Sequence, residues 1–321
     1  MTQFVHEAMP AAQAQHVRFA AGPAFETLIR LSVLTGADGE RRQVPPELRE
    51  EIALVGDRSS ELWLHLLGLA LERPDDIAAA VRATPPAELR RHLAGVYVPS
   101  WRELVGADAL EATARGDATL LDHDRYYAGC ARGALEQLLP LTPAETKRRV
   151  LAVLDRVRID EDVVASLEHD AAVRTAKAAS PSERIASACP GYRYEPEPEL
   201  PDVVLVPHIA ARPWLLLCQH DRSRIICYPL PTEENVEDRL VALGRALGDA
   251  RRVRMLVRLA DGEATLAELA DVTGLAKSTA HHHLAHLRAA GLVEMRGNAQ
   301  QYRFAIRADG LAESSELLRS V

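Results

Sequence analysis

The chain has 321 residues, of which 47% are hydrophobic, 26% are charged and only 4% are aromatic. A chain of this length usually exceeds what a single hydrophobic core can hold, so we expect two domains. Abundant Ala and Leu with few aromatics favour helices over a β-sandwich. No apolar run approaches the roughly 18 to 20 residues that cross a bilayer, and no basic cluster with an apolar core opens the chain. These patterns predict no membrane partner and a cytoplasmic location.

Cysteine usage bears on the compartment and on redox chemistry. The chain has four cysteines: Cys130, Cys189, Cys218 and Cys227. They are too few and too widely spaced for a disulfide framework or a zinc ribbon. In a reducing compartment such thiols stay reduced by default. The sequence therefore predicts no structural metal site.

The net charge of −8 would argue against a nucleic-acid partner, but the charge is distributed unevenly along the chain. Residues 237–307 carry 11 Lys+Arg against 8 Asp+Glu, whereas the residues before and after them are acidic. An acidic body joined to a basic segment is the asymmetry expected when only one end of a protein touches phosphate.

The first part of the sequence predicts a series of helices. Residues 23–35 open with Pro23 and then place apolar residues at helical spacing. The segment from Ser59 is apolar nearly all round and predicts a buried helix, and Thr142 opens a T-x-x-E capping box. Further helices are predicted from Pro74, Pro86, Ser100 and Asp117 and over residues 159–179. Together they predict a helical domain of roughly 180 residues.

The composition of the sequence changes at residues 191–201. Three prolines and three glutamates in GYRYEPEPELP predict a loop or hinge. Short β-branched or aliphatic runs bounded by prolines and polar turns follow it, and they predict a small antiparallel sheet over residues 202–209, 213–220 and 224–230.

A second polar break at residues 231–235 precedes a long predicted helix from Val236 to Gly248. We place the domain boundary there and expect a domain of residues 1–235 for dimerisation or effector binding, with a second domain of residues 236–321. The segment 229–236 would be the hinge between them. The expected fold class is mainly α (α+β), with a small sheet in the helical first domain.

The second domain has the order of a helix-turn-helix followed by a β-wing. Thr265 and Glu268 form a capping box that opens the middle helix, and Gly274 marks the turn. A third helix follows over residues 277–290. Two short strands, LVEMR and QYRFAI, are joined by Gly297-Asn298, which is a strong hairpin signal. This order predicts a winged helix-turn-helix.

Three motifs in this segment resemble the winged helix-turn-helix of the arsenical-repressor (ArsR) family of bacterial regulators. They are ALGDARRVRML for the opening helix, TLAELAD for the scaffold helix and STAHHHLAHLRAAGLV for the recognition helix and first wing strand. The resemblance covers about a fifth of the chain and implies a dimeric, sequence-specific DNA-binding repressor or activator. More loosely, the chain resembles actinobacterial members of this class that carry a long N-terminal domain of unassigned role.

Polar residues at the start of the recognition helix and on the wing are the candidate DNA contacts. A recognition helix reads base edges with side chains of its N-terminal half, and a wing touches the backbone or the minor groove. We expect base contacts from Lys277, Ser278, His281 and His282, phosphate contacts from Thr279 and Arg288, and wing contacts from Arg296, Asn298, Gln300, Gln301 and Arg303. The alternative is that these side chains only form a solvated face.

Metal sensing is not expected. Many members of the ArsR family hold metals with a cysteine pair on the scaffold helix, where this chain has Glu268-Leu-Ala-Asp. Others use histidines and acidic residues on a C-terminal helix, but the tail ADGLAESSELLRSV of this chain contains no histidine. His282 and His286 share a helix face and could hold half of a metal site. We favour the interpretation that the histidine run, His283 included, serves packing or phosphate contact.

A cysteine pair in the predicted hairpin is a candidate redox switch. If the hairpin is centred between Arg222 and Ser223, Cys218 lies directly opposite Cys227, close enough to form a disulfide under oxidation. The alternative is that both thiols are small apolar core residues.

Effector binding is the remaining role for the large first domain, beside plain dimerisation. Aromatic side chains are the plausible walls of an apolar pocket with a few polar anchors. The candidates are Trp63, His65, Trp101, His123, Tyr126 and Tyr127, together with Tyr97, Trp214 and Asp124. Each of them also fits a structural role in an amphipathic or buried helix.

An enzymatic first domain is the main alternative of another class. The sequence has no glycine-rich phosphate loop, no nucleophile elbow and no H-E-x-x-H. We therefore predict no catalytic residues and no cofactor. The expected protein is a regulator, more specifically a homodimeric repressor on a palindromic operator in double-stranded DNA, controlled by a small molecule.

Overall fold

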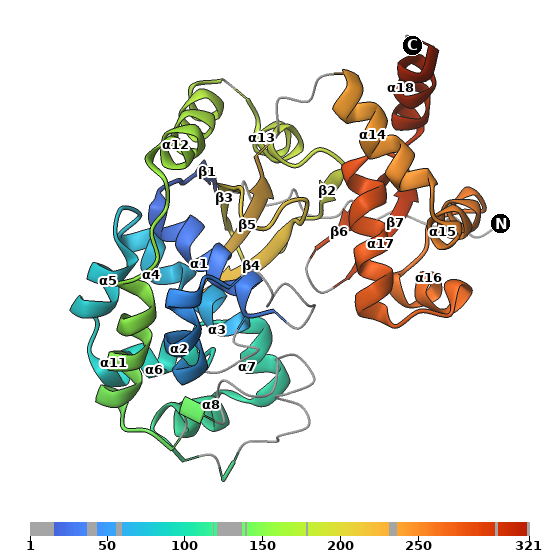
Figure 1. Cartoon of the computed structure of the whole chain (residues 1–321). Helices are drawn as coiled ribbons and strands as arrows, with labels where there is room; N and C mark the ends of the chain where they lie inside the picture. Colours follow the sequence, from blue (N-terminus) through green and yellow to red (C-terminus); the bar gives the residue numbers. More distant parts are fainter. Residues whose placement is uncertain are drawn as a thin grey trace, which may run out of the picture.

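The computed structural model describes residues 16–36, 44–55, 60–117, 119–120, 137–138, 140–177, 179–230, 236–298 and 301–319. The described residues form three parts: a layer of N-terminal helices, a central β-sheet and a C-terminal winged helix (Figure 1). The expected α+β class is confirmed. In the described ranges, no helix combines the length and the apolar character that a membrane span requires.

The N-terminal helices begin where the sequence supplies a proline or a cap. Pro23, Pro86 and Pro143 lie in first turns, and the Thr142 side chain accepts a hydrogen bond from Glu145 N at 3.2 Å. The helices of this layer are α1 (Pro23–Leu34), α2 (Pro46–Val55), α3 (Ser60–His65), α4 (Leu67–Glu72), α5 (Ile77–Ala83), α6 (Pro86–Leu93), α7 (Pro99–Val105), α8 (Ala107–Ala114) and α11 (Pro143–Leu154).

Some of the expected helix starts were wrong. The helix expected from Ser59 is divided at Leu66. Backbone hydrogen bonds there join residues three positions apart, as in a 3₁₀ turn, whereas those of an α-helix join residues four positions apart. The helix expected from Pro74 begins later because the Asp76 side chain caps it. Asp117 lies before a turn, and residues 121–136, which would continue a helix from it, lie outside the described residues.

The central sheet has the strand order β1-β3-β5-β4, with β1 (His16–Phe19), β3 (Asp202–His208), β4 (Leu216–His220) and β5 (Ser223–Pro229). The β3 strand pairs in parallel with both β1 and β5, and only β4 and β5 are antiparallel. The predicted antiparallel pairing is therefore confirmed for β4 and β5 but was wrong for β3. The strands β3 and β5 are buried almost throughout and take the interior positions, whereas the half-buried β4 lies at the edge.

The two faces of this sheet pack against different parts of the molecule. One face, which includes Val204, Val206 and Ile225, joins the core of the N-terminal helices. The opposite face, which includes Val203 and Leu205, joins a second core that also contains the buried residues of the winged helix. The sheet is thus a layer shared by the N-terminal helices and the DNA-binding part.

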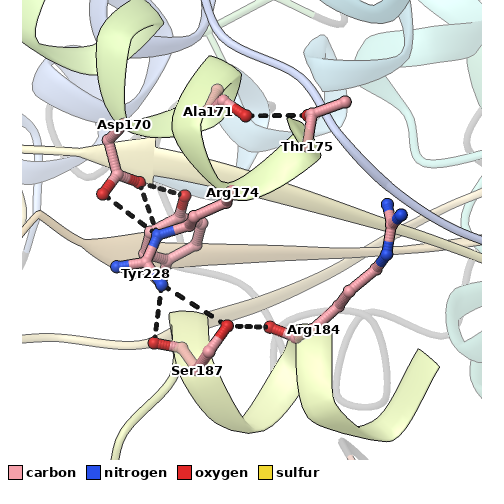
Figure 2. A network of polar contacts seen from close by, with 7 residues as sticks. All are labelled: Asp170, Ala171, Arg174, Thr175, Arg184, Ser187 and Tyr228. Atoms are coloured by element: carbon pink, nitrogen blue, oxygen red, sulfur yellow. Dashed lines mark hydrogen bonds and ion pairs between the residues drawn. The ribbon is translucent and has the colours of Figure 1, made fainter. Parts of the chain in front are cut away.

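Helices α12 (Glu161–Ala176) and α13 (Pro181–Ala188) are joined to β5 by a polar network (Figure 2). Tyr228 donates a hydrogen bond of 2.6 Å to Asp170, which also accepts from Arg174 Nε at 2.8 Å. Arg174 Nη1 reaches on to the Ser187 carbonyl at 2.7 Å. One arginine therefore links both helices and the sheet.

The C-terminal part contains α14 (Val236–Leu247), α15 (Ala250–Ala260), α16 (Leu266–Thr273), α17 (Lys277–Ala289), β6 (Val293–Gly297), β7 (Tyr302–Ile306) and α18 (Ala308–Arg319). The predicted capping box is confirmed, since Thr265 and Glu268 exchange both side-chain to backbone bonds. Gly274 adopts the left-handed conformation (φ 67°) between α16 and α17. The predicted helix-turn-helix and wing are both present.

The expected hinge at residues 191–201 contains regular structure, so that prediction was wrong in part. Strand β2 (Tyr192–Tyr194) pairs in parallel with β6 and gives the wing sheet the order β2-β6-β7. The pairing is supported because Tyr192 is buried and Arg193 donates to Glu294 at 2.9 Å. A segment assigned to the first domain therefore completes the wing. Within the predicted hinge at residues 229–236, Pro229 ends β5 and Val236 begins α14, and residues 231–235 between them lie outside the described residues.

Candidate nucleic-acid interface

The recognition helix α17 is anchored by an apolar face and exposes its first turn. Ala280, Leu284 and Leu287 are fully buried. The polar residues that open the helix, Lys277, Ser278 and Thr279, are exposed. This first turn is the part of a recognition helix that enters a major groove.

The first turn of α17 and the wing border a common hollow of about 700 Å³. Four of the expected DNA contacts line it: Lys277, Arg296, Gln301 and Arg303. Arg296 and Arg303 are opposite each other across β6 and β7. The fold thus brings together cationic side chains that are 26 residues apart in the sequence.

Two of the wing residues have structural partners in this arrangement. Arg296 is paired with Glu263 and Glu294, and these carboxylates raise its pKa. The Asn298 side chain accepts a hydrogen bond of 3.0 Å from Gln301 N and so closes the wing turn. Arg303 is exposed. Gln300 lies outside the described residues.

The other side of α17 faces the N-terminal part of the protein. The Trp214 ring lies 4.5 Å from the His282 ring and 5.2 Å from the His281 ring, measured between centroids. Arg288 donates a hydrogen bond of 2.7 Å to the Pro213 carbonyl, and burial lowers its pKa. Three expected DNA contacts therefore lie against the segment 209–215, and their contact with DNA stays a prediction.

Buried polar groups hold this segment in place. The Glu26 carboxylate on α1 accepts backbone hydrogen bonds from Ile209 (3.1 Å) and Ala210 (2.8 Å). Burial raises the pKa of Glu26, and the two backbone donors oppose that effect. His208 Nε2 donates to the Trp214 carbonyl at 3.1 Å. The segment that covers α17 is thus fixed to α1 and β3.

The histidine run separates into different roles. His283 Nδ1 accepts a hydrogen bond of 3.2 Å from Arg252 and lies 3.9 Å from Asp249, which caps α15. His286 is exposed. In the described part of the chain, no group of three or more metal-ligating side chains is arranged to hold a metal ion.

The effector candidates of the helical layer lie in its core. Trp63, His65 and Trp101 are buried, and the His65 and Trp101 rings are 5.6 Å apart. His65 donates to the Leu93 carbonyl at 3.0 Å, and burial lowers its pKa to about 4. His123, Asp124, Tyr126 and Tyr127 lie outside the described residues. Trp214 lines a cavity beside α17.

The predicted alignment of the cysteine pair was wrong. The hairpin closes over Asp221 and Arg222, with Asp221 at φ 52°, so Cys227 pairs with Leu216 and Cys218 with Ile225. The two thiols are diagonal neighbours and form a hydrogen bond, which together with burial raises the Cys227 pKa well above its usual value. Cys227 is fully buried in the first core.

Sequence reasoning missed the partner of the recognition helix. Nothing near Trp214 signals contact with residues some 70 positions later, because that contact is made only by the folded chain. The buried Glu26 was missed for the same reason. A lone carboxylate on an apolar helix face, within PAFETLIRL, is the signal that could have found it.

Comparisons with known proteins agree with the geometry of the C-terminal part. Residues 249–295 match the arsR family of bacterial regulatory proteins. The chain is 41% identical over 91 residues to the HTH-type transcriptional regulator CmtR of Mycobacterium tuberculosis, covering 28% of this chain and 77% of CmtR. It is 40% identical over 70 residues to the HTH-type transcriptional regulator Rv0324 of the same species, covering 21% of this chain and 31% of Rv0324.

Solved structures give partial matches. HlyU from Vibrio cholerae N16961 is 32% identical, with a TM-score of 0.22, over 27% of this chain and 96% of HlyU. A homodimeric winged helix-turn-helix DNA-binding domain from Mycobacterium bovis is 27% identical, with a TM-score of 0.23, over 28% of this chain and 88% of that domain.

The helix-turn-helix, its exposed first turn and the wing define a DNA-binding transcriptional regulator of the winged-helix class. The identity to most of the length of CmtR specifies the family. The chain belongs to the arsR family of bacterial regulatory proteins.

Proposed function

We propose that the protein is a homodimeric repressor that binds a palindromic operator through α17 and the wing. The observation that carries this proposal is the hollow lined by Lys277, Arg296, Gln301 and Arg303. It joins the first turn of a recognition helix to a basic wing, which is the pairing needed for base and backbone contacts. As a partner of bacterial chromosomal DNA the protein would act in the cytoplasm.

Exposed aliphatic side chains on two neighbouring helices support a dimer. Helices α14 and α18 contact each other. They expose large aliphatic side chains at Val236, Val241, Leu247, Leu311 and Leu318. Apolar residues grouped on adjacent helices are typical of a protein–protein contact. A two-fold dimer would place two recognition helices about 34 Å apart, one turn of DNA.

Repression is the proposed direction of control because a dimer seated on an operator blocks transcription without any further contact. We also propose that the N-terminal part adjusts DNA affinity. The support for this is the contact between Trp214 and the histidines of α17.

Selection of bound sequences from a pool of random DNA duplexes, at a stated salt concentration, tests the proposal. We expect the full-length protein to enrich one palindrome and Lys277→Ala to lose at least about fivefold in affinity for it, since a base contact contributes about 1 to 3 kcal/mol. Lys177→Ala removes an exposed lysine just after the C-terminal end of α12 and is the matched control. Equal enrichment by the Lys277→Ala variant would refute the assignment of the recognition helix.

A further inference from the structure

A cavity of about 410 Å³ lies between the recognition helix and the N-terminal part of the protein. Its walls come from α1, α3, the segment 210–216 and the first half of α17. Pockets of about 300 to 1,000 Å³ are typical of sites for small organic molecules. The cavity is therefore large enough for a ligand of one or two rings.

One wall of this cavity is made of expected DNA contacts. Ser278, His281 and His282 line it, and Trp214 packs on the two histidines from the other side. A major groove about 12 Å wide admits a helix only when that helix is uncovered. In this arrangement the cavity side of α17 is covered, so a molecule in the cavity and a DNA duplex compete for the same face.

The chemistry of the walls indicates an uncharged ligand. Leu64, Val33 and Trp214 supply apolar surface, while serine hydroxyls and histidine rings supply hydrogen-bonding groups. Arg212 and Glu61 contribute one charge of each sign, so the walls carry no net charge. Burial lowers the pKa of His281, which favours the neutral form of this ring. A flat apolar body with hydroxyl groups matches these walls.

We propose that this cavity binds a small, flat, uncharged aromatic molecule bearing hydroxyl groups, and that the bound molecule holds the recognition helix against the N-terminal part. The effect on DNA binding rests on the function proposed above, whereas binding in the cavity does not. A ligand that contacts the covered arrangement and not the DNA-bound one shifts the equilibrium toward the covered arrangement. Coupling of this kind typically changes affinity about 5- to 150-fold.

The test uses the full-length protein and 2-naphthol, a neutral two-ring phenol, as the probe in isothermal titration calorimetry. We expect binding with a dissociation constant below about 1 mM. Leu64→Trp fills the cavity from α3 without changing an expected DNA contact, and Val33→Phe fills it from α1. Each is expected to weaken 2-naphthol binding at least tenfold. Leu54→Trp adds the same ring at an exposed position on α2 and is expected to bind the probe as the parent does.

The same variants test the coupling to the selected operator. Saturating 2-naphthol should weaken operator binding by the parent at least fivefold and leave binding by Leu64→Trp unchanged. Trp214→Ala removes the covering ring and should tighten operator binding by up to about tenfold if the covered arrangement holds about 90% of the molecules.

Two results would overturn the ligand site: no 2-naphthol binding by the parent at 1 mM, or equal binding by the parent and both filling variants. Probe binding that leaves operator affinity unchanged would overturn the coupling. If the parent protein enriches no DNA sequence, the proposed function has failed. The calorimetric titration still decides the ligand site, because it contains no DNA.

Discussion

Replacing Glu197 by alanine should destabilise the protein more than any other change in its acidic linker. Glu197 and Arg224 form an ion pair in which each side chain is 1% exposed. Arg224 Nε donates to Glu197 at 2.7 Å, and the Tyr194 hydroxyl donates to the same carboxylate at 3.2 Å. The pair fixes the linker that follows β2 to the central strand β5. Its removal would leave a guanidinium buried without its counter-charge.

The magnitude follows from that uncompensated charge. Breaking a buried ion pair by removing one partner costs about 3 to 5 kcal/mol. Arg224 keeps one hydrogen bond, of 3.0 Å to the Cys218 carbonyl, while Tyr194 loses an acceptor at a cost of about 1 kcal/mol. We therefore expect Glu197→Ala to lose about 4 kcal/mol of unfolding free energy. Glu197→Gln keeps an acceptor oxygen and should lose less.

Urea unfolding followed by far-UV circular dichroism measures this loss, and the linker provides its own control. Glu199 lies two residues further on and is exposed, so Glu199→Ala should stay within about 0.5 kcal/mol of the parent. A Glu197→Ala protein within about 1 kcal/mol of the parent would show that the ion pair does not hold the linker.

The remaining predictions concern pH and the thiols. Burial lowers the pKa of His65, His92 and His208 to about 4 each. Between pH 6.5 and 4 the unfolded chain therefore binds more protons than the folded chain, and the stability of the fold decreases as the pH drops. Each histidine should cost about 1.4 kcal/mol at pH 5.5, or about 4 kcal/mol together, relative to pH 7.5. Urea unfolding of the parent and of the exposed control His169→Asn at both pH values checks this, and a loss below 1 kcal/mol would contradict it. Because the Cys227 pKa is raised, it should stay unmodified by iodoacetamide at pH 7.5 until the protein unfolds. Mass spectrometry of labelled native protein reads this out, and rapid native labelling of Cys227 would revive the redox-switch hypothesis.

The winged helix could be predicted from sequence because its signals are local. A capping box, a glycine in the left-handed conformation and a hairpin turn each act within four or five residues. Apolar spacing then fixes which face of α17 is buried. Together they gave the order of the elements and the exposed first turn.

Strand order could not be predicted in the same way. The runs at β3, β4 and β5 indicate strands, but their order depends on which strands are buried on both faces. The short strands β1 and β2 carry little signal of their own and form because β3 and β6 offer them an edge. The contact of Trp214 with α17 depends in turn on this arrangement of the sheet.

Besides the apolar core that it shares with the central sheet, the winged helix has two polar attachments to the rest of the chain that differ in strength. Strand β2 is paired with β6 through backbone hydrogen bonds, and the linker behind it is fixed by the buried Glu197–Arg224 pair. The recognition helix is held to segment 209–215 by two ring contacts with Trp214 and one hydrogen bond to Pro213. Ring contacts of this kind contribute about 0.5 to 1.5 kcal/mol each. The contact that covers α17 should therefore open while β2 stays paired to the wing, which makes that contact the natural place for a ligand to act.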